Sequence, residues 1–335
     1  MKLRVVTIVW TLVVGAWFVP GCHEAGVGAL SPSSKAWPHY RGGSDQRGVA
    51  PGELPDKPAL LWQFKTGGEI KSSPVIAGNR VFIGSGDGRI YALNLANGKS
   101  IWSYKTGGAV EAPPCILEDK VIAGSADGFL YCLAAATGKL IWRYRTGDEI
   151  LAAANCARRS DGPARVLVGS YDGLLHCVDA ATGKGIWKYE TGNYINGSPA
   201  VASGAAVFGG CDAVIHAVSL GTGKRAAGIE TGSYIAGSAA VADGRAYVGN
   251  YDGYFICADI AEGKVVWKYG QGELPFFSSA AVGARRVVFG GRDKRLLCVD
   301  RKTGRSLWTF RTGGQVNSSP VICGGKVVFG SGDGR

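Results

Sequence analysis

The chain repeats one stretch, Gly98-Lys99-Ser100-Ile101-Trp102-Ser103-Tyr104-Lys105-Thr106-Gly107, in close variants along most of its length. Each copy centres on one tryptophan, and the copies follow one another at a nearly constant interval, with one double interval. The tryptophans are Trp62, Trp102, Trp142, Trp187, Trp267 and Trp308. At the double interval, Ala227 stands where a further tryptophan is expected. A self-similar unit of about 40 residues is the signature of a repeat architecture.

Each unit contains four short apolar runs separated by turns. In the unit that ends at Gly107, the runs lie at 73–77, 81–84, 89–93 and 101–104. Runs of β-branched and aromatic residues that are interrupted by Asn-Gly and Asp-Gly predict antiparallel strands joined by hairpins. Four strands per unit predict an all-β fold, a β-propeller of four-stranded antiparallel blades, with six complete units and a truncated seventh.

The segment 1–21 has the pattern of a lipoprotein-like signal peptide. A basic start at 1–4 precedes an apolar run at 5–19, which is short for a membrane span and typical of a signal-peptide core. Val19-Pro20-Gly21-Cys22 is similar to a lipobox and predicts lipidation at Cys22. Ordinary cleavage and an uncleaved anchor are the alternatives, and all three outcomes export the chain.

The remaining chain divides into two parts. Residues 22–58 are expected to form a tether and an N-terminal flap, in which 37–43 is the ordered portion, and residues 59–335 are expected to form the propeller. A strand at 60–65 precedes any complete unit, so we expect it to close the ring as the fourth strand of the last blade. The chain stops before the third strand of unit seven. This predicts a C-terminally incomplete propeller from a parent of seven or eight blades.

The recurring tryptophans are expected to lock neighbouring blades together. A large ring in the outer strand can wedge into the seam between two blades and bury up to ~200 Å². Such burial stabilises by a few kcal/mol. The outer strand around Ala227 lacks this ring, so we expect it to be the weakest part of the propeller.

Aromatic residues gather in the loops that enter the innermost strands of units four to six. They are Tyr194, Tyr234, Phe276 and Phe277. Their shared position predicts one arc at the mouth of the central channel, where they form a candidate patch for a peptide or a partner loop. Alternatively, these side chains plug the channel.

Charge and motif content argue against several functions. The net charge is +11, but an exported chain is not expected to bind nucleic acid. Four cysteines occupy the same position of the repeat unit and are therefore expected to be small core residues: Cys132, Cys177, Cys257 and Cys298. Four further cysteines, at 115, 156, 211 and 323, offer no obvious pair. Because neither HExxH nor CxxC occurs, we predict no metal site, no cofactor and no catalytic residues, and therefore no enzyme.

One recurring string carries a family resemblance. It comprises Gly84-Ser85, Asp87-Gly88, Tyr91-Ala92-Leu93, Gly98-Lys99 and Trp102, and it repeats over 60–335. This string resembles the repeat of pyrroloquinoline-quinone-type propellers. With the lipoprotein-like leader directly before the ring, the chain resembles the BamB family of outer-membrane β-barrel assembly lipoproteins.

The resemblance implies an extracytoplasmic, non-catalytic scaffold. Its implied partners are envelope proteins, including an outer-membrane assembly complex, and it implies a monomeric ring anchored through Cys22 at the periplasmic face of the outer membrane. The alternatives are a pyrroloquinoline-quinone-dependent dehydrogenase and a sensor or ligand-binding propeller. The dehydrogenases carry an adjacent cysteine pair, and no two cysteines are neighbours in this sequence.

Overall fold

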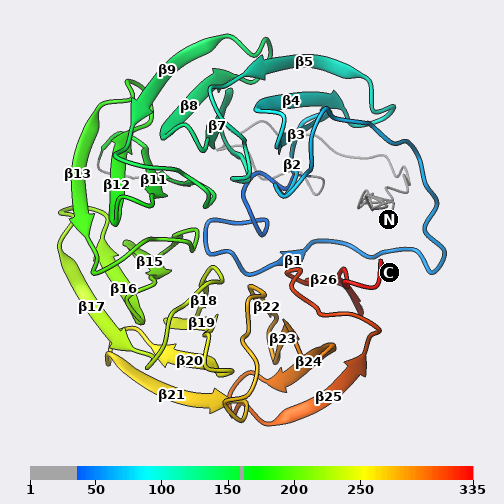
Figure 1. Ribbon diagram of the computed structural model, residues 1–335, viewed down its shortest axis with the longest axis vertical. Coiled ribbons are helices and arrows are strands. Elements are labelled where there is room, and N and C mark those ends of the chain that lie inside the picture. Colours follow the sequence, from blue (N-terminus) through cyan, green and yellow to red (C-terminus); the bar gives the residue numbers. More distant parts are fainter. Residues whose placement is uncertain (1–35, 159–161, 335) are drawn as a thin grey trace, which may run out of the picture.

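Seven β-sheets stand around a common axis as the blades of a propeller (Figure 1). The computed structural model describes residues 36–158 and 162–334, and the regular structure in these ranges consists of 27 strands. The all-β propeller predicted from the repeats is confirmed. The predicted signal peptide and Cys22 lie outside the described residues. Within the described ranges, no helix is long and apolar enough to cross a membrane.

Blades 1 to 3 each contain four antiparallel strands in chain order, with the first strand innermost. Blade 1 consists of β2 (Val75–Ala77), β3 (Arg80–Ser85), β4 (Arg89–Asn94) and β5 (Ser100–Lys105). Blade 2 consists of β6 (Cys115–Leu117), β7 (Lys120–Gly124), β8 (Phe129–Ala134) and β9 (Leu140–Arg145). Blade 3 consists of β10 (Asn155–Ala157), β11 (Arg165–Gly169), β12 (Leu174–Asp179) and β13 (Gly185–Glu190).

Blades 4 to 6 repeat the same order. Blade 4 consists of β14 (Ala200–Ala202), β15 (Ala205–Gly209), β16 (Val214–Ser219) and β17 (Arg225–Glu230). Blade 5 consists of β18 (Ala240–Ala242), β19 (Arg245–Gly249), β20 (Phe255–Asp259) and β21 (Lys264–Tyr269). Blade 6 consists of β22 (Ala281–Val282), β23 (Arg286–Gly291), β24 (Arg295–Asp300) and β25 (Ser306–Arg311).

The recurring small residue of the third strand lies directly opposite the tryptophan of the outer strand. Ala92 pairs with Trp102, Cys132 with Trp142, and Cys257 with Trp267. The register between the two strands shifts immediately after each of these pairs, which marks a β-bulge. A small side chain at this point leaves room for the indole. The recurring cysteines are therefore buried packing residues.

The seventh sheet differs from the other six. It contains β1 (Val49–Ala50), β26 (Val321–Cys323) and β27 (Lys326–Val328), and β1 pairs with β26 in parallel. The N-terminal strand in this sheet is therefore β1. Residues 60–65, which we expected to close the ring as an outermost strand, have no strand hydrogen bonds in the structure, although Trp62 packs on blade 1 as the outer-strand tryptophans pack on the blade that follows them. No strand among the described residues lies beside 60–65 to complete a ladder.

Residues 37–50, which we call the hub segment, run along the middle of the ring and contact all seven blades (Figure 1, blue). Six innermost strands form backbone hydrogen bonds with it, through Ile76, Ile116, Val201, Val241, Val282 and Ile322. Blade 3 bonds through the Asn155 side chain, whose Nδ2 donates to the Ser44 carbonyl at 2.7 Å. The sequence predicted a flap on the ring, whereas this segment is a structural part of it.

Two buried polar side chains fix the hub segment further. Arg41 is 4% exposed, and its Nη2 donates to the Ala280 carbonyl at 2.6 Å. Gln46 is 2% exposed, and its Nε2 donates to the Pro199 carbonyl at 3.0 Å. Buried donors need such partners because an unpaired one is costly.

Candidate functional site

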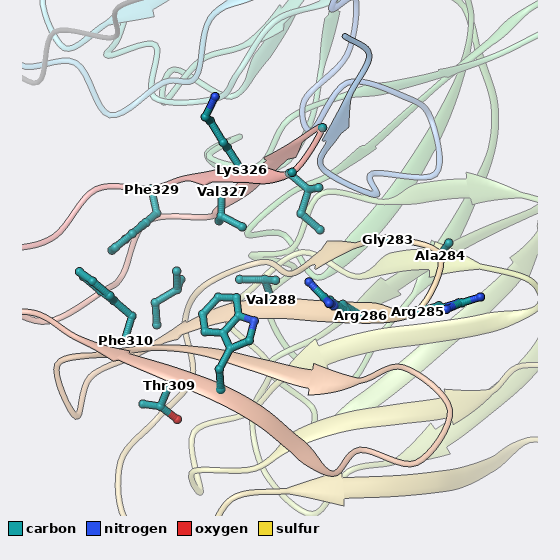
Figure 2. Close-up of a pocket in the computed structure, with 15 residues that line it drawn as sticks. Gly283, Ala284, Arg285, Arg286, Val288, Thr309, Phe310, Lys326, Val327 and Phe329 are labelled. Carbon is teal, nitrogen blue, oxygen red and sulfur yellow. The ribbon is translucent and has the colours of Figure 1, made fainter. Parts of the chain in front are cut away.

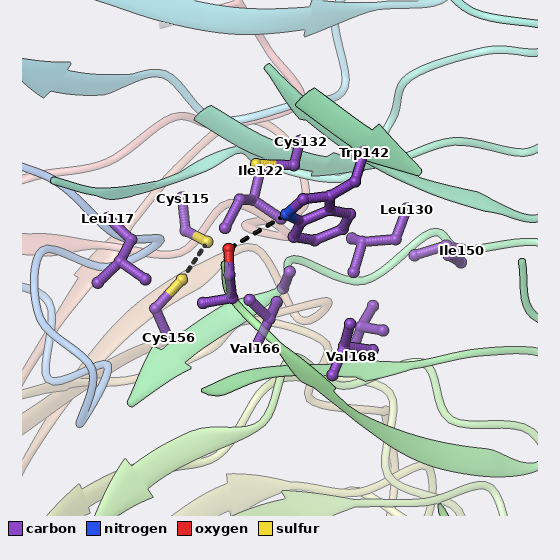
Figure 3. Close-up of a cluster of buried hydrophobic side chains, with 13 residues drawn as sticks. Cys115, Leu117, Ile122, Leu130, Cys132, Trp142, Ile150, Cys156, Val166 and Val168 are labelled. Atoms are coloured by element: carbon purple, nitrogen blue, oxygen red, sulfur yellow. Dashed lines mark hydrogen bonds between the residues drawn. The ribbon is translucent and has the colours of Figure 1, made fainter. Parts of the chain in front are cut away.

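Four of the six recurring tryptophans join one blade to the next, and a fifth, Trp62, joins the segment 60–65 to blade 1. In each, the indole Nε1 donates to a backbone carbonyl of the following blade, at 2.9–3.2 Å. The donors are Trp62, Trp102, Trp142, Trp187 and Trp267. Each ring also lies on a glycine of that blade, where an added Cβ would come within 2.5–2.7 Å of the indole. Figure 3 shows the hydrogen bond that the Trp142 indole donates.

Trp308 has different surroundings. It lines a groove of about 810 Å³ between blades 6 and 7, together with Val288, Phe310, Val327 and Phe329 (Figure 2). The other tryptophans meet a glycine at the corresponding seam, but this indole faces the groove.

The aspartates that recur at one turn also connect blades. Asp87 Oδ2 accepts a hydrogen bond from the Gly67 amide at 2.8 Å, and the contact recurs between Gly107 and Asp127 at 2.7 Å. Burial raises the pKa of Asp87, but hydrogen bonds from Tyr91 and Gly67 outweigh it and leave this pKa below its ordinary value. These two carboxylates stabilise the loops that they bind.

In blades 3 and 4, histidine replaces the tyrosine that bonds this aspartate. His176 Nε2 lies 2.9 Å from Asp172 Oδ2, and its Nδ1 lies 3.0 Å from the Tyr144 hydroxyl. His216 forms the same contacts with Asp212 and Tyr189. Both histidines are buried, so their rings contact no substrate-accessible surface. Burial lowers the pKa of His176, and the opposing charge of Asp172 only partly offsets this effect.

Aromatic side chains line one arc of the loops around the axis. We call this the aromatic rim, and it comprises Tyr171, Tyr194, Tyr234, Tyr251, Phe277 and Arg292. Tyr171 stacks on Tyr194 with ring centroids 5.1 Å apart. Tyr251 contacts both Tyr234, at 6.2 Å, and Phe277, at 4.8 Å. The Arg292 guanidinium lies 5.0 Å from the Phe277 ring centroid, which is cation–π geometry.

Three tyrosines of the rim are exposed to solvent. The exposed fractions are 51% for Tyr194, 53% for Tyr234 and 42% for Tyr251. Their loops are fixed by backbone hydrogen bonds, since the Tyr251 amide donates to the Tyr234 carbonyl and the Cys211 amide donates to the Tyr194 carbonyl. The rim therefore presents large rings from a backbone that is already ordered.

Phe276 does not belong to this surface, and its assignment to the partner patch was wrong. It is 6% exposed and packs edge-on against Phe255 and Phe289. Its position matches that of Ile195 and Ile235, which are fully buried. All three bond through their amides to the second strand or the turn that follows it, so this position points into the blade.

The sequence prediction missed Tyr171 and Tyr251. Both stand immediately before the recurring aspartate of the second turn, in Tyr-Asp-Gly. That turn lies beside the loop entering the next blade, as the bond from the Tyr251 amide to the Tyr234 carbonyl demonstrates. The repeated Tyr-Asp-Gly in blades 3 and 5 was the available signal.

A second group of reactive side chains lies on the inner strands of blades 2 and 3. Cys115 Sγ and Cys156 Sγ are 2.9 Å apart, and His39 of the hub segment lies beside them. The hydrogen bond with Cys156 and burial raise the pKa of Cys115 well above its ordinary value. Burial and the nearby charge of Arg158 lower the pKa of His39 to about 4. Cys115 and Cys156 form no disulfide in the structure, but the inner strands of adjacent blades bring their sulfurs together, which the sequence did not indicate.

Radial sheets, a tryptophan at nearly every seam and aspartate-fastened loops define a β-propeller built from pyrroloquinoline-quinone-type repeats. The family model described as outer membrane protein assembly factor BamB matches residues 55–164, 158–226 and 211–335. The chain belongs to this family.

A solved structure shares the fold. The crystal structure of BamB from Moraxella catarrhalis superposes with a TM-score of 0.69 at 20% sequence identity, covering 82% of this chain and 84% of that chain. At this identity the likeness concerns the fold alone. A comparison with proteins of curated function gave no match.

Proposed function

We propose that this protein is a non-catalytic, extracytoplasmic propeller that binds envelope proteins through its aromatic rim and assists outer-membrane protein assembly. The observation that carries the proposal is the exposure of Tyr194, Tyr234 and Tyr251 on one arc of the loops around the axis. Membership in the family of outer membrane protein assembly factor BamB supports the assembly role.

The rim has the composition of a protein-binding surface. Tyrosine and arginine are enriched at interface hot spots, because large rings bury much area with few rotatable bonds. The Tyr171–Tyr194 stack and the Arg292–Phe277 contact hold their rings before any partner arrives. Such preorganisation lowers the entropy cost of binding.

The polar residues that recur in the blades are accounted for by structure. Five of the seven recurring aspartates accept a hydrogen bond from a backbone amide of the preceding loop, and His176 and His216 are buried. A scaffold needs no reactive group at these positions. The proposal also includes export, a lipid anchor at Cys22 and a monomeric ring at the periplasmic face of the outer membrane.

Site-specific photocrosslinking tests the proposal. A benzoylphenylalanine at Tyr194 is expected to crosslink to an outer-membrane assembly protein in intact cells. The matched control places the same group at Lys184, an exposed turn residue of blade 3 outside the rim. The double variant Tyr234→Ala/Tyr251→Ala is expected to reduce the crosslink at 194. Equal products from 194 and 184, or none from 194, would overturn the proposal.

A further inference from the structure

His39, Cys115 and Cys156 place three metal-ligating atoms within 4.8 Å of one another. The two cysteines come from adjacent blades, and the histidine comes from the hub segment that runs between them. Figure 3 shows the two sulfur atoms facing each other across the seam. Cys115 is fully buried and Cys156 is 4% exposed.

The same positions carry hydrocarbon side chains in other blades. Cys115 begins its inner strand where blade 1 has Val75, and Cys156 stands second in its strand, where blade 1 has Ile76 and blade 2 has Ile116. Packing alone is therefore satisfied by valine and isoleucine at these points. Two thiols at one seam are a departure from the repeat that core formation does not require.

His39 is also unusual for a packing residue. Its Nδ1 is buried and has no hydrogen-bond partner among the described residues. Its carbonyl accepts a hydrogen bond from the Gly42 amide at 2.9 Å, which fixes the turn that carries the ring. A buried ring nitrogen with a free lone pair is costly unless a donor or a metal ion occupies it.

We propose that His39, Cys115 and Cys156 bind one zinc ion between the hub segment and blades 2 and 3. Zinc accepts thiolate sulfur at about 2.3 Å and imidazole nitrogen at about 2.0–2.1 Å. A centre at these distances requires the two sulfurs to move apart and the imidazole to approach by roughly 1 Å. The fourth position is left for water or another small ligand.

Charge balance selects the ion. Binding releases one proton from each thiol to solvent, so two thiolates and one neutral imidazole surround one Zn²⁺ and the centre is neutral overall. A neutral centre avoids the large cost of burying net charge. A monovalent soft cation with the same ligands would leave a buried negative charge. The observations thus favour a divalent thiophilic ion.

Zinc titration of the reduced full chain tests this site. The chain, purified under argon with a phosphine reductant, is expected to bind one Zn²⁺ per molecule in competition with a chromophoric chelator. Cobalt in place of zinc is expected to give a sulfur-to-cobalt charge-transfer band. Cys115→Val and Cys156→Ile insert the residues that other blades use and therefore keep the fold. Each is expected to weaken zinc binding by at least about 100-fold, because losing a ligand costs more than losing an outer-shell partner, which costs about 10–100-fold.

Matched controls exclude general thiol effects. Cys257 and Cys298 are buried cysteines at the repeat position where blade 1 has Ala92. Cys257→Ala and Cys298→Ala are therefore expected to leave zinc affinity unchanged. His39→Gln is expected to weaken binding by at least about 10-fold while far-UV circular dichroism is unchanged. Absence of stoichiometric zinc in the reduced chain, or equal affinity in Cys115→Val, would overturn the proposal. So would an isolated chain lighter by two hydrogen atoms because Cys115 and Cys156 form a disulfide.

Discussion

Replacing Trp142 by alanine measures how strongly one indole holds two blades together. The ring is 8% exposed, lies on Gly183 and donates to the Ala180 carbonyl at 3.1 Å. Burial of a tryptophan removes about 150–250 Å² from water, which at about 25 cal/mol per Å² corresponds to about 4–6 kcal/mol as an upper bound. Measured truncations of large core aromatics cost about 3–5 kcal/mol.

We therefore expect Trp142→Ala to lower the free energy of unfolding by about 4 kcal/mol. The variant should still fold, because blade 4 carries alanine at the same position, Ala227. Trp142→Phe keeps a ring in the seam but loses the hydrogen bond, so we expect it to cost about 1–2 kcal/mol.

Urea unfolding followed by far-UV circular dichroism is the assay. With a slope of about 3 kcal/mol per molar for a domain of this size, the midpoint of Trp142→Ala should fall by more than about 1 M. A loss below about 1 kcal/mol, or equal losses in the alanine and phenylalanine variants, would refute the idea that the buried ring holds the seam.

Three further outcomes follow from the structure. Amide exchange should be faster in the strand at Ala227 than in the strand at Trp142, and equal exchange rates would contradict this expectation. Ala227→Trp should raise the free energy of unfolding by about 1–3 kcal/mol, because no atom lies within 4 Å of a Cβ built at Gly263, so the seam has room for the indole. The pKa values of His176 and His216 in the folded state lie below the unfolded value of about 6.5, so the free energy of unfolding should fall as the pH drops from 7 to 5. In denaturant titrations, a variant with tyrosine at both positions should show a weaker dependence on pH. Deleting the hub segment should lower the free energy of unfolding by roughly 5 kcal/mol or more, since seven backbone hydrogen bonds to inner strands are lost. An unchanged melting temperature in calorimetry would show that the hub segment does not stabilise the propeller.

The repeat made the blades predictable from the sequence. A tryptophan at a near-constant interval and an Asp-Gly at most second turns are local signals in the sequence. In the structure, the contacts of these residues reach only the adjacent blade or loop. The position of Phe276 was not predictable in this way. The loop before it is one residue longer than in blades 3 and 4, so the first phenylalanine takes the buried position of Ile235.

Contacts at the axis were the harder part to predict. The sequence distance between Cys115 and Cys156 suggests separate blades, and only convergence of the inner strands brings the two sulfurs to 2.9 Å. His39 joins them from a segment that carries no repeat at all. Likewise, no local pattern in Val49–Ala50 indicates a partner as distant as Ile322.

The central position of the hub segment has a consequence for biosynthesis. Residues 37–50 emerge before any blade exists, yet their last partner, β26, is near the other end of the chain. Long-range closure of this kind is slow, and inner-strand amides stay unpaired until it is complete. An incompletely folded propeller would therefore expose unpaired strand edges that can pair with other chains. Pairing of Val49–Ala50 with β26 would end this exposure for the seventh sheet.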